Sequence, residues 1–132
     1  MIGISGECFA EVSINDEQAI RAIIGEDSNS YDGMVAVACG IRNRKSLSGV
    51  YGLKAVVWRN GELVRLHSKT RKPIEVISPE LWQQASKAWN ESYFGPDVVN
   101  GASHWEGKHL KQPYWAKSFK NSKVVGANRF YW

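Results

Sequence analysis

The stretch Ile23-Ile24-Gly25-Glu26-Asp27-Ser28-Asn29-Ser30 joins two segments whose apolar residues recur at helical spacing. In the segment before the loop, the apolar residues are Ala19, Ile20, Ile23 and Ile24. In the segment after it, they are Met34, Val37, Ala38 and Ile41. Such spacing places apolar side chains on one face of a helix. We therefore predict a helix that follows Asn15 and weakens at Gly25, a polar loop, and a second helix over about residues 32–43.

The rest of the chain predicts fewer regular elements. Asn60-Gly61 is a strong hairpin turn signal, so residues 53–66 are expected to form a β-hairpin. Residues 69–73 are interpreted as a basic loop. Ser78-Pro79 is typical of a helix start, and that helix is expected to reach about residue 93. The last 37 residues predict loops, one short helix near 115–119 and a final strand at 128–132. The expected fold is α+β, mostly helical, in a single domain over residues 1–132.

Composition narrows the possible functions. The chain has 132 residues, of which 43% are hydrophobic and 23% are charged, and this balance excludes wholesale disorder. No run of 18 apolar residues is present, so no membrane-spanning helix is expected. No secretory signal is recognised at the start of the chain. The net charge of +4 favours polyanionic partners such as nucleic acid, anionic lipid or cell-wall polymer. The six tryptophans suit either a core or a groove that binds sugars or bases.

Glu26 is the residue whose position is most informative for chemistry. It falls at the expected end of the first helix, beside Ile23 and Ile24. The negative end of the helix dipole and the apolar neighbours both favour the protonated carboxyl. A carboxyl that holds its proton near neutral pH can act as the general acid in glycosidic bond cleavage. The alternative is an exposed glutamate at a helix end, with no catalytic role.

From Ile24 onward, the motifs of the chain resemble those of the SleB-like cell-wall hydrolases, which are spore-cortex-lytic enzymes and their bacterial and phage relatives. The family has an aromatic-Gly-Glu loop, then Tyr-x-Gly-x-x-Ala-Val-Ala, then Leu-Asn-Arg. The chain has Ile24-Gly25-Glu26, then Tyr31-Asp32-Gly33-Met34-Val35-Ala36-Val37-Ala38, then Ile41-Arg42-Asn43-Arg44. The order of these motifs is the same in both.

The resemblance continues near the end of the chain, and altogether it covers roughly residues 15–131. Ala102-Ser103-His104-Trp105 is similar to an Ala-Thr-His-aromatic stretch of the family. Pro113-Tyr114-Trp115-Ala116 is similar to its Pro-x-Trp-Ala element. Gly126-Ala127-Asn128-Arg129-Phe130-Tyr131 is similar to its closing Gly-x-His-x-Phe-Tyr strand. The chain departs from the family in lacking the second acidic residue of the loop, where Asp27-Ser28-Asn29-Ser30 stands instead.

The resemblance implies a lysozyme-like fold and cleavage of the β-1,4 bond between N-acetylmuramic acid and N-acetylglucosamine. It implies a lytic transglycosylase in which Glu26 acts first as acid and then as base. The expected substrate-binding residues are Tyr31, Ser103, His104, Trp105, Trp115 and Tyr131, and for each of them packing in the core is the alternative. A hydrolytic muramidase would need a second carboxylate, for which Asp27 and Asp32 are the nearby candidates.

Three other classes of function are alternatives to this one. A zinc amidase would use His104, His109 and His67, but the first two are five residues apart rather than four. A cysteine peptidase would use Cys39, which lies within a helix rather than at its start; Cys39 and Cys8 are both interpreted as buried small hydrophobes. A non-catalytic module could bind cell wall or nucleic acid through the lysines of the C-terminal third.

The resemblance also implies a biological setting. We expect a monomer that acts on peptidoglycan glycan strands, without a metal or cofactor, without nucleic acid as a partner and without stable membrane insertion. Small basic lysins of phages have this form. The expected location is therefore the host cytoplasm, from which the lysin is released to the cell wall.

Overall fold

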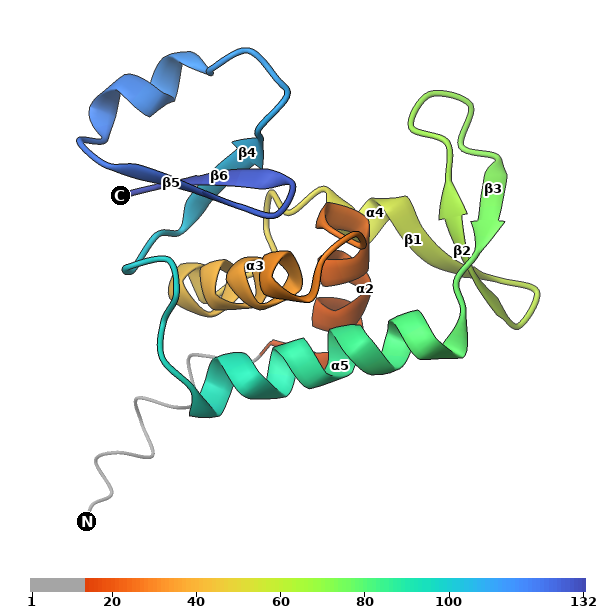
Figure 1. Cartoon of the computed structure of the whole chain (residues 1–132). Helices are drawn as coiled ribbons and strands as arrows, with labels where there is room; N and C mark the ends of the chain where they lie inside the picture. Colours follow the sequence, from red (N-terminus) through yellow and green to blue (C-terminus); the bar gives the residue numbers. More distant parts are fainter. Residues whose placement is uncertain (1–13) are drawn as a thin grey trace.

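Three helices form the centre of the computed structural model, which describes residues 14–132 (Figure 1). They are α2 (Asp16–Glu26), α3 (Tyr31–Arg44) and α5 (Pro79–Phe94), and they pack against one another. Each begins after a side chain that accepts a hydrogen bond from a backbone N–H of the first turn. Residues 33–41 of α3 are all buried, so this helix runs through the core.

The predicted hairpin is part of a three-stranded antiparallel sheet. Its strands β1 (Val56–Arg59), β2 (Glu62–Leu66) and β3 (Pro73–Val76) lie in that order. The expected strand start near residue 54 is wrong, because residues 52–55 form the short helix α4 (Gly52–Ala55). The basic loop also ends sooner than expected, since Pro73 begins β3.

The last third of the chain contains a second sheet that the sequence analysis did not predict. Strands β4 (His104–Gly107), β6 (Asn128–Tyr131) and β5 (Ser122–Val125) are antiparallel and lie in that order. Only β6 and the one-turn helix η1 (Tyr114–Ser118) correspond to predicted elements. Strands β4 and β5 both pair with β6, so they depend on contacts distant in sequence.

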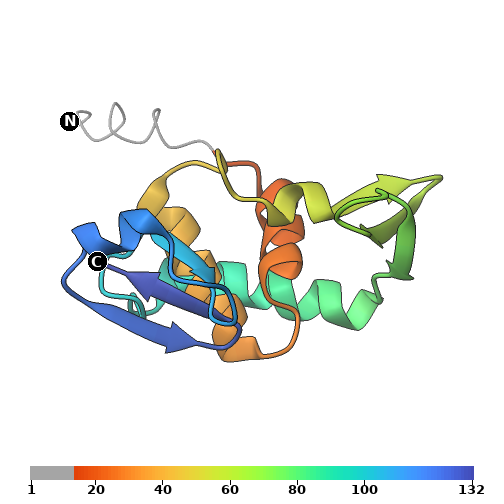
Figure 2. The same cartoon turned by 90° about the horizontal axis from the view of Figure 1, so that it is seen from above.

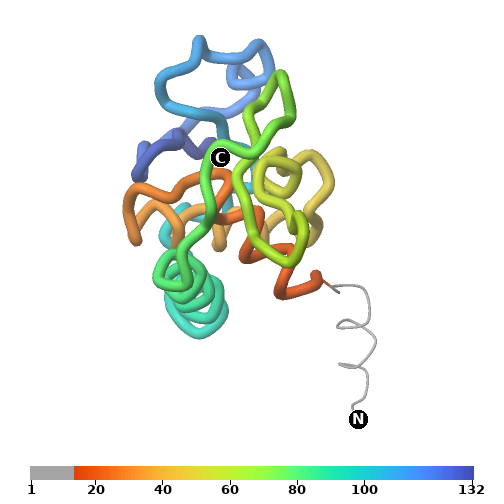
Figure 3. The backbone as a smooth tube through the Cα atoms, turned by 90° about the vertical axis from the view of Figure 1, so that its right-hand side faces the viewer, coloured from red at the N-terminus to blue at the C-terminus, as the bar shows by residue number. Residues whose placement is uncertain are grey.

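The two sheets lie on opposite sides of α2, as two perpendicular views show (Figures 1 and 2). Figure 3 looks nearly along α5, with strands β1–β3 toward the viewer. Helix α2 contacts α3, α4, α5 and β1, and therefore connects most parts of the fold. Its last residue is Glu26, which places that side chain close to the second sheet.

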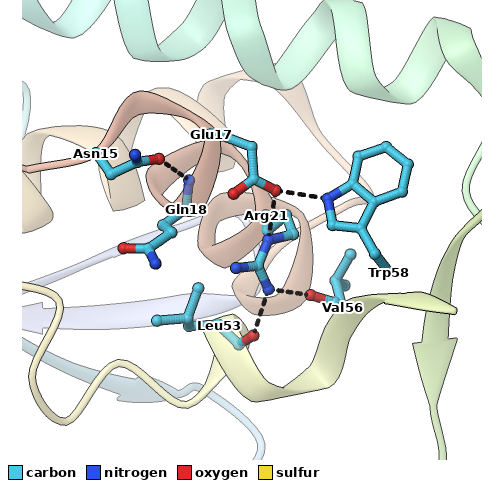
Figure 4. Close-up of polar contacts among 7 residues, drawn as sticks. All are labelled: Asn15, Glu17, Gln18, Arg21, Leu53, Val56 and Trp58. Carbon is cyan, nitrogen blue, oxygen red and sulfur yellow. Dashed lines mark hydrogen bonds and ion pairs between the residues drawn. The ribbon is translucent and has the colours of Figure 1, made fainter. Parts of the chain in front are cut away.

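Arg21 of α2 fixes the position of α4 and β1 (Figure 4). One of its terminal nitrogens donates hydrogen bonds to the backbone oxygens of Leu53, at 3.2 Å, and Val56, at 2.8 Å. Its Nε forms an ion pair with Glu17, 2.7 Å away, and the same carboxylate accepts a hydrogen bond from Trp58 Nε1. These contacts hold α4 against α2, and this packing brings Gly52 to Glu26.

Candidate active site

A cleft of about 450 Å³ lies where the end of α2, residues 49–51, β4 and the segment from β4 to η1 meet. Its walls carry carboxylates, cations and aromatic rings. The lining residues are Glu26, Arg44, Gly49, Val50, Tyr51, His104, Trp105, Glu106, Gly107, Leu110, Lys111, Pro113 and Trp115. The cleft is open to solvent and large enough for a sugar unit, and it is therefore the candidate site for a polar ligand.

The carboxyl of Glu26 is held at the wall of this cleft by two hydrogen bonds. Its Oε2 accepts from the backbone N–H of Gly52 at 2.6 Å. Its Oε1 accepts from the indole Nε1 of Trp105 at 2.8 Å. The side chain is half-buried. Both oxygens are therefore fixed in direction before any substrate binds, as catalysis by a positioned carboxyl requires.

The bond from Gly52 depends on the close approach of α2 and α4. A Cβ at Gly25 would fall against the backbone oxygen of Gly52, and a Cβ at Gly52 would fall against the backbone of Ala22 and Glu26. Neither position has room for a side chain. Gly25 weakens α2 in the sequence, but in the structure it allows the contact that orients Glu26.

The indole of Trp105 is seated between α3 and the second sheet. A Cβ at Gly40 would lie 2.8 Å from the Trp105 ring, so the absence of a side chain there makes room for the indole. The ring centroid of Phe130 lies 5.8 Å away on β6. Gly40 thus lets the Trp105 indole pack directly against α3.

The two aspartates considered as second acids do not line the cleft. Asp27 is 3% exposed, and its carboxylate accepts hydrogen bonds from the backbone N–H groups of Asn29, Ser30 and Ala127. It ties the loop between α2 and α3 to the turn between β5 and β6. Asp32 is exposed in the first turn of α3 and lines a different hollow. The second carboxylate of the cleft is elsewhere.

Glu106 is that second carboxylate, and the sequence analysis did not single it out. Its Oε2 accepts a hydrogen bond from the Tyr131 hydroxyl at 2.6 Å. Its Oε1 is the one buried side-chain oxygen or nitrogen without a hydrogen-bond partner among residues 14–132. Burial and the bond to Glu106 raise the pKa of Tyr131 to about 12, so this phenol stays a donor at neutral pH. The sequence held no signal for Glu106, because β4 itself was not predicted.

Of the six expected substrate-binding residues, the structure brings three to the cleft: His104, Trp105 and Trp115. The Tyr31 hydroxyl instead donates to Glu91 of α5, and burial together with this bond raises the pKa of Tyr31 to about 12. Ser103 is within 3.2 Å of His104 Nδ1 but does not line the cleft. Tyr131 is 2% exposed and packs against Trp115.

Two cleft residues with exposed apolar surface were also missed. Tyr51 precedes α4 and is 76% exposed, while Leu110 lies between β4 and η1 and is 56% exposed. Both line the cleft with Trp115. Aromatic and apolar surface of this kind suits stacking on sugar rings. Sequence alone does not show this, because nothing near Tyr51 or Leu110 distinguishes them from ordinary loop residues.

The residues that a zinc amidase or a cysteine peptidase would use do not form a catalytic site. Cys39 is buried in α3 with a thiol pKa raised chiefly by burial, whereas a nucleophilic cysteine has a lowered one. Cys8 lies outside the described residues. His67 caps the turn between β2 and β3, and His104 packs against Trp115 and Phe119. Among residues 14–132, no three His, Cys, Asp or Glu side chains are grouped to hold a metal ion.

The described chain is thus an α+β fold whose cleft presents one doubly hydrogen-bonded carboxyl at the end of a helix. No family model matches the chain, and no curated protein sequence matches it. Its structure is similar to the crystal structure of the catalytic domain of the Bacillus cereus SleB protein, with a TM-score of 0.56 and 22% sequence identity over 91% of each chain. The predicted α+β, lysozyme-like fold of the SleB type is confirmed.

Proposed function

We propose that this protein degrades peptidoglycan by cleaving the β-1,4 bond between N-acetylmuramic acid and N-acetylglucosamine. The observation that carries the proposal is the Glu26 carboxyl, fixed by Gly52 and Trp105 at the wall of an open cleft. The likeness of the fold to the catalytic domain of the Bacillus cereus SleB protein, over 91% of each chain, supports the proposal. A carboxyl, aromatic rings and an open cleft are what a glycosidase requires.

The proposed reaction is a lytic transglycosylation in which one carboxyl makes both proton transfers. Protonated Glu26 donates its proton to the glycosidic oxygen as the bond from that oxygen to C1 of the muramoyl residue breaks. The Glu26 carboxylate then removes the proton from the muramoyl 6-hydroxyl as O6 bonds to C1. The product is a 1,6-anhydro ring, water is not consumed, and Glu26 ends protonated again. Positioned acid–base catalysis of this kind accounts for roughly 10²–10⁴-fold in rate.

Hydrolysis is the second candidate, and Glu106 is the observation that favours it. A hydrolytic muramidase needs a second carboxylate in the same cleft, and Glu106 lines that cleft while Asp27 and Asp32 do not. In this reaction Glu26 protonates the leaving oxygen and the Glu106 carboxylate removes a proton from the attacking water. The product then ends in a reducing muramic acid.

Mass spectrometry of digested peptidoglycan tests the proposal and separates the two reactions. The proteins compared are the wild type, Glu26→Gln, Glu106→Gln and the control Glu62→Gln, which changes an exposed carboxylate of β2. Anhydro ends from the wild type, Glu106→Gln and the control, but not from Glu26→Gln, are the expected result. Reducing ends that disappear in both Glu26→Gln and Glu106→Gln would support hydrolysis instead.

Absence of any glycan cleavage by folded wild-type protein would contradict both reactions and favour a non-catalytic binding module. A binding module has no need of Glu26, so Glu26→Gln would then leave its affinity for cell wall unchanged. The monomeric state, the location in a host cytoplasm and the role as a phage lysin stay predictions from the sequence. No helix in residues 14–132 is both long and apolar enough to cross a membrane.

A further inference from the structure

Arg44 is a cation at the wall of the candidate active site. It is the last residue of α3, it is half-buried, and it lines the same cleft as Glu26. Its guanidinium carbon lies 5.0 Å from the ring centroid of Trp105. Trp105 is also the donor that holds Glu26. The Trp105 side chain therefore lies next to both Arg44 and the proposed catalytic carboxyl of Glu26.

Arg44, unlike three other half-buried arginines, has no hydrogen-bond acceptor among the described residues. Arg21, Arg42 and Arg65 each donate to backbone or side-chain oxygens. Among residues 14–132 the ion pairs are Glu17–Arg21 and Arg65–Glu75, and no described group accepts a hydrogen bond from Arg44. The helix dipole stabilises a cation at this end of α3 but does not occupy its five N–H donors.

A second cation lines the cleft on a different segment. Lys111 lies between β4 and η1, is exposed, and has no ion-pair partner among the described residues. An unpaired, partly desolvated guanidinium has a strong preference for a carboxylate, which it binds through two parallel hydrogen bonds. A neutral N-acetylated sugar would satisfy these donors only through uncharged oxygens, those of its hydroxyls and its acetamido carbonyl. The charges of this wall thus favour a ligand with its own carboxylate.

We infer that Arg44 and Lys111 form a subsite for a carboxylate of the glycan substrate. This inference rests on the proposed function, because peptidoglycan supplies such a group beside the scissile bond. The lactyl side chain of muramic acid ends in a free carboxylate where the stem peptide is absent. Where a peptide is attached, the lactyl group is an amide and the peptide provides carboxylates of its own. The subsite therefore makes the enzyme prefer muramoyl glycan to neutral chitin-like chains.

Binding, rather than cleavage, gives the direct test. The probes are a neutral N-acetylglucosamine tetramer, a peptide-free tetrasaccharide of alternating N-acetylglucosamine and N-acetylmuramic acid, and the same tetrasaccharide with stem peptides. Affinity is followed by NMR titration of the Trp105 indole N–H. The variants are Arg44→Gln, Arg44→Lys, Lys111→Gln and the matched control Arg59→Gln, which changes an exposed arginine of β1.

Arg44→Gln is expected to weaken binding of a muramoyl probe by about tenfold or more, the loss typical of a hydrogen bond to a charged group. Arg44→Lys is expected to recover part of the loss, and Lys111→Gln to lose less, because Lys111 is exposed. A loss confined to the peptide-free probe identifies the lactyl carboxylate as the ligand. A loss confined to the peptide-bearing probe identifies the carboxylates of the peptide.

Four results would overturn the inference: an equal loss for the neutral tetramer, the same loss in Arg59→Gln, no effect of Arg44→Gln, or no binding of either muramoyl probe by the wild type. The failure of the proposed function is a separate result. Arg44-dependent binding without glycan cleavage would support the carboxylate subsite and contradict the proposed enzymatic function. Glycan cleavage by a wild type that binds all three probes equally would support the enzymatic function and contradict the carboxylate subsite.

Discussion

At the scale of single residues, the site depends on what holds Glu26. Glu26 is recognisable in the sequence because its residue type, its place at a helix end and its motif are local properties. The two donors to its carboxyl, Gly52 and Trp105, are 26 and 79 residues away along the chain. The donor from Gly52 is a backbone N–H, which every residue except proline has, so the sequence does not distinguish it.

Replacing Glu26 by glutamine is expected to lower activity by at least about 100-fold, because the amide cannot exchange the proton. Glutamine also has one oxygen, so either the Gly52 N–H or the Trp105 indole loses its acceptor. The free energy of unfolding should therefore fall by roughly 1–3 kcal/mol. Urea denaturation beside the peptidoglycan digest measures both effects. Retention of wild-type turnover would exclude Glu26 as the catalytic acid.

Trp105→Phe separates the donor from the ring. Phenylalanine keeps an aromatic side chain beside Gly40 and Phe130 but has no N–H for Glu26. We expect kcat to fall by about tenfold, the equivalent of roughly 1.4 kcal/mol, with a smaller change in KM. Unchanged kcat with a large rise in KM would show that Trp105 binds substrate and does not orient the carboxyl.

Asp27→Asn is expected to act through stability rather than chemistry. The change replaces one carboxylate oxygen with an NH₂ that faces the N–H of Ala127 or of Asn29. A buried donor without an acceptor costs about 1–3 kcal/mol, which urea denaturation would detect. The folded fraction should keep its specific activity. A loss of kcat without a loss of stability would instead favour a catalytic role for this aspartate.

At the scale of elements, the sequence predicted the three long helices, the β1–β2 hairpin and β6, but not α4, β3, β4 or β5. Helices α2, α3 and α5 have apolar residues at helical spacing and a capping side chain, both of which are local. Strands β4 and β5 have four residues each, with no clear alternation of apolar and polar side chains. They exist because each pairs with β6. The part of the cleft wall that β4 and its residue Glu106 form could therefore not be predicted from the sequence.

Gly52→Ala tests the contact between α2 and α4. The added Cβ would meet the backbone of Ala22 and Glu26, so α4 must move away from α2. Overpacking of this kind costs roughly 1–3 kcal/mol, and the shift also withdraws the Gly52 N–H from the carboxyl. Both stability and kcat should fall. Lys54→Ala, an exposed change in the same helix, should alter neither and serves as the control.

At the scale of the whole molecule, two tyrosine hydroxyls connect separate elements. Tyr31 joins α3 to α5 through Glu91, and Tyr131 joins β6 to β4 through Glu106. Burial and these bonds raise the pKa of each phenol to about 12, above the ordinary value of 10. A raised pKa means that the folded state holds the proton more tightly than the unfolded state. This stability is complete below pH 10 and is lost as the pH rises toward 12.

We therefore expect the urea midpoint to fall between pH 10 and pH 12. The slope of this fall should be smaller in Tyr31→Phe and in Tyr131→Phe, because each variant removes one of the two titrating phenols. A midpoint that stays constant over this range in the wild type would contradict the argument. The exposed phenol of Tyr114 provides the control, and Tyr114→Phe should follow the wild-type slope.

The pairing of β4 with β6 also determines when the site can work during synthesis. Within the described residues β4 has no other strand neighbour, so Trp105 reaches its place only after residues 128–131 have been made. A nascent chain that ends before residue 128 has Glu26 but lacks β6, the strand that holds β4 and its residue Trp105 in place. The site is therefore incomplete until residues 128–131 have been made and have paired with β4.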